Sequence, residues 1–162
     1  MWGMFYECQW LESVPPKTFD RAAPNAEIDC LFYFARSLES VPQGLFDSFT
    51  QTKSFDRIFY GCAKLDALPD GLFYKCERAK SFVGTFYFCS ALKKLPVNLF
   101  ASNNAKDFSV TFAGCTALEE IPEDLFNECV NAINFEGTFA ACESLKSIPK
   151  DLFAKKYCSQ QL

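Results

Sequence analysis

The sequence contains no histidine, so the commonest general base and the commonest transition-metal ligand are both missing. No apolar run approaches the roughly 18 residues that a helix needs to span a bilayer, so we expect no membrane span. Acidic and basic residues alternate along the chain, without a block of like charges, and the net charge is only -4. A nucleic-acid-binding surface is therefore not expected either.

The first residues also lack the features of a secretory signal. The stretch MWGMFYECQWLESVPP has neither a basic start nor a continuous apolar segment. We therefore expect that the signal of an exported protein, if there is one, lies outside this chain.

Phenylalanine and cysteine are abundant, with 19 and nine copies in 162 residues, and 49% of the residues are apolar. A chain of this length and composition can bury a real core, so disorder is not expected. Because the number of cysteines is odd, at least one thiol stays free unless it pairs with another chain.

The origin of this composition is an internal repeat. A proline recurs at spacings of 27, 27, 27, 26 and 27 residues and divides the chain into six units. The prolines are Pro15, Pro42, Pro69, Pro96, Pro122 and Pro149. Sixteen of the 19 phenylalanines lie at three fixed distances from these prolines, so the composition follows from the repeat.

Several columns keep their residue type from unit to unit. A leucine stands four residues before each proline, and a phenylalanine stands ten residues before it and four after it. Seven residues before it stand Cys8, Cys62, Cys89, Cys115 and Cys142, with Ala35 in the second unit. A unit of this size cannot bury its own apolar face, but stacked units can, and the retained columns then form ladders inside a solenoid.

We predict one repeat domain over residues 1–162, an α/β solenoid of about six coils. The segment from leucine to proline is short and ends at a residue that cannot donate to a ladder, so it predicts one short parallel strand per coil. The residues after the proline predict a helical turn. Phe82, Phe86 and Cys89, at steps of four and three, predict a short helix.

The repeat pattern F-x-x-T-F-x-x-C-x-x-L-x-x-I-P-x-x-L-F resembles the BspA-like leucine-rich repeats of bacterial surface proteins. SFVGTFYFCSALKKLPVNLF and NFEGTFAACESLKSIPKDLF match it best, and the resemblance covers all six units. It implies a curved α/β solenoid that binds proteins or mediates adhesion, with an extracellular or cell-surface location.

The cysteines permit three interpretations: metal ligands, a disulfide framework, or buried free thiols. Ladder members are 26 or 27 residues apart, or 54 where Ala35 interrupts, and stand in single file, whereas a metal site needs converging ligands. Parallel side chains on adjacent coils are also slightly too far apart for a disulfide. We expect buried thiols that fill space and donate weakly, without a metal or cofactor. Cys30, Cys76, Cys129 and Cys158 lie off this ladder.

Two sets of residues are candidates for binding a ligand. Aromatic residues outside the three phenylalanine columns are candidates for surface contacts: Phe34, Phe49, Phe88, Tyr60, Tyr74 and Tyr87. The two positions between the leucine and the apolar residue before the proline are mostly polar and would form one exposed strip. As candidate ligand-binding residues on this strip we take Glu39, Asp66, Lys93, Lys94, Glu119, Glu120 and Lys146. The alternative interpretation of the strip is an ordinary solvated surface, where neighbouring opposite charges relieve repulsion.

No nucleophile with a base and no phosphate-binding loop occurs, so we expect no enzyme. The predicted function is protein or surface-ligand binding through the strand face. The alternative is a structural spacer or assembly component of a larger exported protein or a phage particle.

The two ends of the solenoid differ. The residues 154–162, AKKYCSQQL, are polar enough for a modest cap. The first coil places Trp2, Met4, Phe5 and Trp10 at an open apolar end. We therefore expect either further repeats or end-to-end self-association through this coil.

Overall fold

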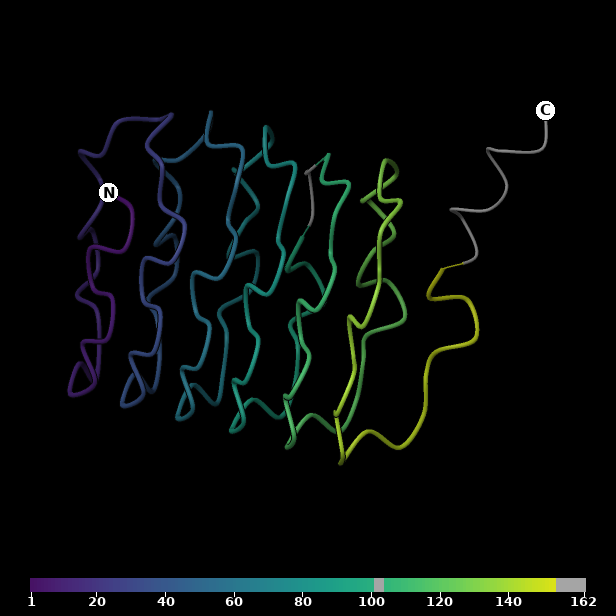
Figure 1. Cartoon of the computed structure of the whole chain (residues 1–162). Helices are drawn as coiled ribbons and strands as arrows, with labels where there is room; N and C mark the ends of the chain where they lie inside the picture. The colour runs from purple at the N-terminus through teal and green to yellow at the C-terminus, as the bar shows by residue number, and fades with distance from the viewer. Residues whose placement is uncertain (101–103, 154–162) are drawn as a thin grey trace.

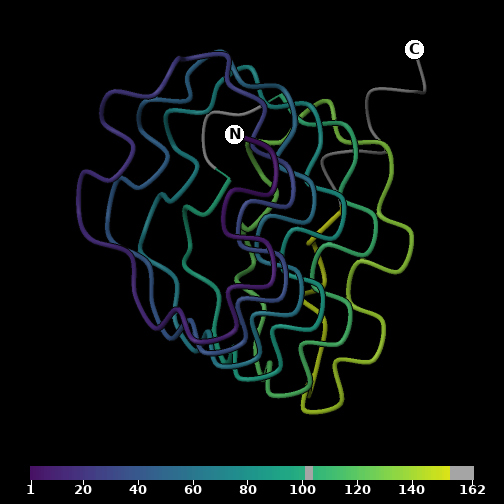
Figure 2. The same ribbon diagram turned by 60° about the vertical axis from the view of Figure 1, so that its left-hand side comes forward.

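The structure, a computed structural model, describes residues 1–100 and 104–153. Its chain winds through successive coils that lie side by side in a row, from the N-terminal purple end to the yellow end (Figure 1). Turned by 60°, the coils nest behind one another as similar closed outlines (Figure 2). We number the coils 1 to 6, beginning at residues 1, 28, 55, 82, 108 and 135, so that equivalent residues share a column. The repeat solenoid predicted from the sequence is therefore present.

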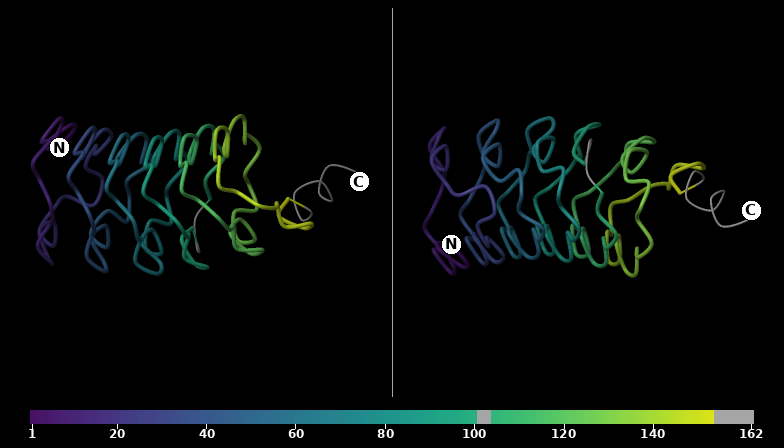
Figure 3. Two further views of the ribbon diagram at one scale, coloured as in Figure 1. Left: turned by 90° about the horizontal axis from the view of Figure 1, so that it is seen from below. Right: turned by 90° about the horizontal axis from the view of Figure 1, so that it is seen from above.

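One side of each coil is a chain of tight turns, which we call the turn wall: residues 3–11, 30–38, 57–65, 84–92, 110–118 and 137–145. In coil 4 the amide of Tyr87 donates to the Gly84 carbonyl at 3.1 Å, and that of Cys89 donates to Phe86 at 3.1 Å. The alternate amides of coil 4 bond to coil 5 instead. The Phe86 amide donates to the Thr111 carbonyl at 2.9 Å, and the Phe88 amide donates to the Ala113 carbonyl at 2.8 Å. Figure 3 shows these turns as a row of narrow loops along one edge.

The predicted helix over Phe82, Phe86 and Cys89 is not confirmed, because the described residues contain turns there and no α-helix. Gly84 and Phe88 both have positive φ, 59° and 58°, and a type II turn requires positive φ at its third residue. Left-handed residues four apart interrupt a right-handed helix, while still bringing Phe86 and Cys89 to the interior. A spacing of four and three thus arises here from linked turns.

The segments after the prolines are also turns, such as the one that the Leu45 amide closes on the Pro42 carbonyl at 3.3 Å. The predicted strands are reduced in the described residues to isolated parallel bridges. Two of these bridges join Ser13 to Ser40 and Lys94 to Glu120, just before the prolines. Others connect Ser54, Ser81, Asp107 and Asn134 in a second row, at the last residue of coils 2 to 5. The α/β detail of the prediction is therefore not confirmed.

The core between these rows is built from phenylalanine rings. Phe32, Phe59, Phe86 and Phe112 are fully buried, and rings of adjacent coils lie nearly parallel at centroid distances of 5.4 to 5.5 Å. A second column, Phe46, Phe73, Phe100 and Phe126, stacks at 5.3 to 6.0 Å. Rings of different columns meet edge to face, as Phe55 and Phe73 do at 5.2 Å. The coils therefore hold together through one continuous aromatic core.

Hydrogen bonds join the coils inside this core. The Cys89 thiol donates to the carbonyl of Phe59 in the previous coil at 3.2 Å, and Cys62, Cys115 and Cys142 make the equivalent contact. Thr111 is fully buried, and its hydroxyl lies 2.7 Å from the Phe108 carbonyl and 2.9 Å from the Phe82 carbonyl. Buried polar groups in these columns thus find partners on the neighbouring coil.

In the described part of the chain, no helix is long and apolar enough to cross a membrane. The proposed C-terminal cap at 154–162 and Cys158 lie outside the described residues.

Candidate functional site

The candidate residues lie together on one surface, which we call the polar face. Its members are Glu39, Asp66, Lys93, Lys94, Glu119, Glu120 and Lys146. All are exposed except Glu119, which is half-buried. Each lies one or two residues after a leucine of the inner column, and Leu38, Leu65, Leu92 and Leu118 are buried. The inward leucines thus fix the position of the outward polar side chains.

Backbone hydrogen bonds between coils hold this surface in register. The Glu39 amide donates to the Glu12 carbonyl at 3.0 Å, and that of Asp66 donates to the Glu39 carbonyl at 3.4 Å. In later coils Glu119 donates to Lys93 at 3.1 Å and Lys146 to Glu119 at 3.5 Å. The side chains of the column therefore stand in one row, as expected for parallel pairing.

A shallow open groove of about 430 Å³ crosses the polar face between coils 2 and 5. It is lined by Glu39, Ala63, Lys64, Asp66, Ala91, Lys93 and Ala117. The three alanines carry no group longer than a methyl, and the other four lining residues are charged. A depression lined by small and charged residues can accept side chains from another polypeptide.

The charges on the polar face are only partly paired with one another. Lys64 Nζ lies 3.5 Å from Glu39 Oε1, and Lys146 Nζ lies 3.1 Å from Glu119 Oε2. The hydrogen bond from Lys146 lowers the pKa of the Glu119 carboxyl, and the positive charge of that lysine adds to the effect. Within the described residues Asp66, Lys93 and Glu120 form no ion pair. Unpaired charges of both signs therefore face solvent.

Lys64 and the three alanines of the groove were not among the residues selected from the sequence. They belong to columns five and six residues before the proline, which lack a constant residue type. The small side chains of Ala63, Ala91 and Ala117 next to the charged strip were the available signal, although residue types alone do not show that they line one groove. The charged columns identified only Glu39, Asp66 and Lys93 among the residues that line the groove.

A second surface feature is a stack of tyrosines along the turn wall. Tyr6, Tyr33, Tyr60 and Tyr87 stack in succession with ring centroids 4.8, 4.6 and 4.8 Å apart. Partial burial raises the pKa of the Tyr60 hydroxyl, and the neighbouring tyrosines add to that shift. Because the ring faces cover one another, only their edges are available to a ligand. The stack is therefore poorly suited to binding sugars by ring stacking.

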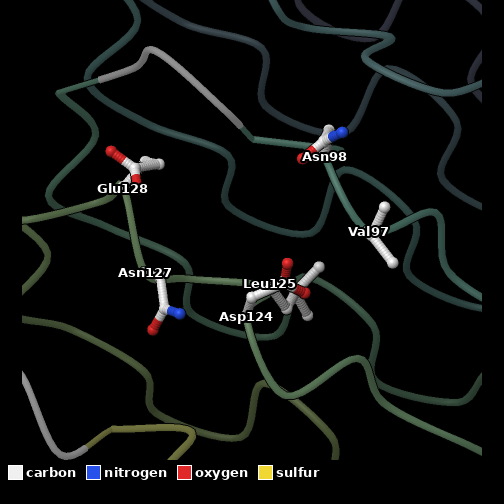
Figure 4. Close-up of a pocket in the computed structure, with 6 residues that line it drawn as sticks. All are labelled: Val97, Asn98, Asp124, Leu125, Asn127 and Glu128. Atoms are coloured by element: carbon white, nitrogen blue, oxygen red, sulfur yellow. The ribbon is translucent and has the colours of Figure 1, made fainter.

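Another depression lies beside the turns that follow Pro96 and Pro122, with a volume of about 120 Å³ (Figure 4). Its lining consists of Val97, Asn98, Asp124, Leu125, Asn127 and Glu128. This volume is too small for an organic ligand of ordinary size.

The eight cysteines of the described residues are free thiols. Burial raises the pKa of Cys62, Cys89 and Cys115, so these thiols stay protonated at neutral pH. Residues 1–100 and 104–153 contain no group of three or more potential ligands placed to hold a metal ion.

No protein-family model and no curated protein matches the chain. The solved structures to which it is similar include a leucine-rich repeat protein from Bacteroides ovatus, with 19% identity and a TM-score of 0.34 over 93% of this chain and 35% of that one. A T. pallidum leucine-rich repeat protein matches with 18% identity and a TM-score of 0.34, over 96% of this chain and 74% of that one.

A leucine-rich cell surface protein from Faecalibacterium prausnitzii is a third neighbour, at 17% identity and a TM-score of 0.32, over 85% of this chain and 42% of that one. The chain spans about a third of the Bacteroides ovatus protein, which has further regions. These neighbours are bacterial leucine-rich repeat proteins, which agrees with the resemblance of the repeat motif. At such low TM-scores they carry no argument about function.

Proposed function

We propose that this chain is a non-enzymatic protein-interaction module that acts in adhesion at the cell surface or outside the cell. Its polar face would recognise a protein or another surface ligand. One observation carries the proposal: backbone hydrogen bonds between coils hold the charged residues in one row, and four charged side chains line an open groove of about 430 Å³. Solenoids often use such extended surfaces for binding.

The order of charges on the polar face suggests the chemistry of a partner. Glu39 and Asp66 are acidic, Lys93 and Lys94 in the next coil are basic, and Glu119 and Glu120 are acidic again. A complementary partner therefore presents a basic, then an acidic, then a basic group along an extended segment. Electrostatic matching of this kind contributes to specificity and to the association rate.

The test is a comparison of the parent chain with a face variant that carries Lys93→Glu, Lys94→Glu, Glu119→Lys and Glu120→Lys. A control variant carries Lys53→Glu, Lys80→Glu, Glu77→Lys and Glu128→Lys. All eight positions are exposed or half-exposed, and both variants keep the net charge of the parent. The three proteins are immobilised and probed with host extracellular proteins, mucins and bacterial surface extracts.

A partner that binds the parent and the control but not the face variant supports the proposal. A partner that binds all three equally, or the absence of any partner, contradicts it and favours the structural spacer. Circular dichroism and thermal unfolding of all three proteins verify that the charge reversals leave the solenoid folded.

A further inference from the structure

Over the first five residues of each turn-wall segment, the backbone hydrogen bonds between coils run forward, from an amide to a carbonyl of the following coil. Near the end of the segment they run backward, as the Ser37 amide does to the Gln9 carbonyl at 3.2 Å. The Gly3 amide donates to the Asp29 carbonyl at 3.0 Å, and the Phe5 amide to Leu31 at 2.9 Å. At the last such junction Phe112 donates to Thr138 at 2.9 Å. In this first part of the turn wall, each coil therefore presents amide groups to the coil that follows and carbonyl groups to the coil that precedes it.

The two ends of the row are consequently different. In coil 1 the carbonyls of Trp2, Met4 and Tyr6 accept no backbone hydrogen bond from the described residues. In coil 6 the amides of Gly137, Phe139 and Ala141 donate none to the described residues. The first set consists of acceptors and the second of donors, at the same positions of the repeat.

On the polar face the direction is reversed. The Glu39 amide donates backward to the Glu12 carbonyl at 3.0 Å, and the Lys146 amide donates to the Glu119 carbonyl at 3.5 Å. This leaves the Glu12 amide at the first coil and the Lys146 carbonyl at the last without a backbone partner among the described residues. The two ends are thus complementary on both sides of the coil.

We propose that the first coil of one copy of this chain stacks on the sixth coil of a second copy, as consecutive coils stack within the chain. The amides of Gly137, Phe139 and Ala141 then donate to Trp2, Met4 and Tyr6 of the other copy. The Glu12 amide donates to the Lys146 carbonyl. Pairing of two first coils is disfavoured, because it places acceptors against acceptors.

The side chains at the two ends continue the columns of the interior. Phe5 and Phe139 belong to the column whose rings stack at 5.4 to 5.5 Å in the chain. Lys146 already contacts Glu119 at 3.1 Å on one side, and Glu12 of the second copy would arrive on its other side. Charge as well as ring geometry therefore favours this partner.

The first coil also leaves apolar side chains in water. The exposed fractions are 64% for Trp2, 52% for Met4, 42% for Tyr6 and 89% for Trp10. Burial of such side chains favours association. Because coils 1 and 6 lie at opposite ends of the row, the contact does not close on itself and produces chains of copies (Figure 1).

The test uses the full chain and two end variants. The head variant carries Trp2→Lys and Met4→Lys, and the tail variant carries Ala140→Lys and Ala141→Lys. A matched control, Tyr74→Lys with Val97→Lys, changes exposed side chains in coils 3 and 4, away from the ends, by the same charge. Sedimentation velocity over a concentration series measures the size of each protein and of a 1:1 mixture of the two end variants.

The parent and the control are expected to form species that lengthen with concentration. Each end variant alone should bind itself at least about tenfold more weakly, which is about 1.4 kcal/mol. The mixture should form dimers and nothing larger, because only one intact head and one intact tail remain per pair. A monomeric parent at all concentrations, an end variant that still forms chains, or a mixture that stays monomeric would overturn the proposal.

Discussion

The ring of Phe88 fills the space in which a β-carbon on Gly114 would lie. Its Cε1 atom is 2.6 Å from that position, and Gly61 meets the ring of Phe34 in the same way. Gly114 also has a positive φ of 74°. A residue without a side chain is therefore needed there both for the turn and for the ring of the previous coil.

We expect Gly114→Ala to lower the free energy of unfolding more than Gly84→Ala does. Both positions have positive φ, so both alanines suffer backbone strain of about 1–2 kcal/mol. At Gly84 the nearest atom to a new β-carbon is 3.6 Å away, so no clash is added. At Gly114 overpacking against Phe88 adds about 1–3 kcal/mol. Urea unfolding of both variants measures the difference.

The double variant Phe88→Ala with Gly114→Ala serves as the control. Removing the ring should cancel the overpacking, so the two substitutions together cost less than their sum. Additive effects, or equal costs for Gly84→Ala and Gly114→Ala, would show that the close approach of the ring is unimportant.

The buried threonines are expected to stabilise the contact between coils. Thr111→Val keeps the shape of the side chain but removes the hydroxyl bonds to the Phe82 and Phe108 carbonyls, and should cost about 1 kcal/mol. Thr116→Val is a comparison, because that hydroxyl lies 3.4 Å from its acceptor, Ser90, and is only partly buried. Thermal unfolding that shows no loss for Thr111→Val would contradict a stabilising role of these bonds.

The reactivity of the thiols should differ sharply along the chain. Cys8 is exposed, whereas burial raises the pKa of Cys62, Cys89 and Cys115. In a Cys158→Ser background, native protein at pH 8 should therefore show one fast reaction with an aromatic disulfide reagent. Adding Cys8→Ser should remove it. A fast phase that survives in the double variant would mean that the core thiols are accessible.

Asp56 is expected to make stability depend on pH. Burial raises the pKa of its carboxyl, although hydrogen bonds from Ser81 and the Val83 amide oppose the shift. Since the folded pKa lies above the unfolded one, the folded state binds more protons between the two values, and stability falls as pH rises through that window. At a pH above this window, the charged Asp56 carboxylate therefore lowers the free energy of unfolding.

Asp56→Asn removes this cost and keeps an oxygen that can accept both hydrogen bonds. The variant should be at least as stable as the parent at pH 7, and the difference in stability should narrow as the pH falls from the raised pKa of folded Asp56 to the ordinary pKa of aspartate. Urea midpoints across this range measure the effect. A variant that is less stable at pH 7 would show that the bonds to the charged form dominate.

The proline spacing was sufficient to predict the solenoid and to assign Phe59, Phe86 and Phe112 to one column, since apolar residues at a fixed period must face the same interior. The local structure was harder to predict. Steps of four and three at Phe82, Phe86 and Cys89 fit a helix and a series of linked turns equally well. Left-handed residues such as Phe88 and Val110, with φ of 58° and 46°, have no signature in their residue type.

The candidate site was also predicted only in part. The charged columns placed Lys93 and Glu119 on a common surface, because inward leucines leave their neighbours outside. The groove between Ala63, Ala91 and Ala117 depends on how coils are offset, which residue types alone do not reveal. What the polar face binds is a property of the partner as well and stays a prediction.

The most direct measurement of the central claim is hydrogen exchange of the chain with and without a partner captured by the parent and the control variant. We predict slower exchange of the amides at 37–39, 64–66, 91–94 and 117–120, which line the polar face. Protection confined to the turn wall or to the first and last coils, with these segments unchanged, would contradict recognition through the polar face.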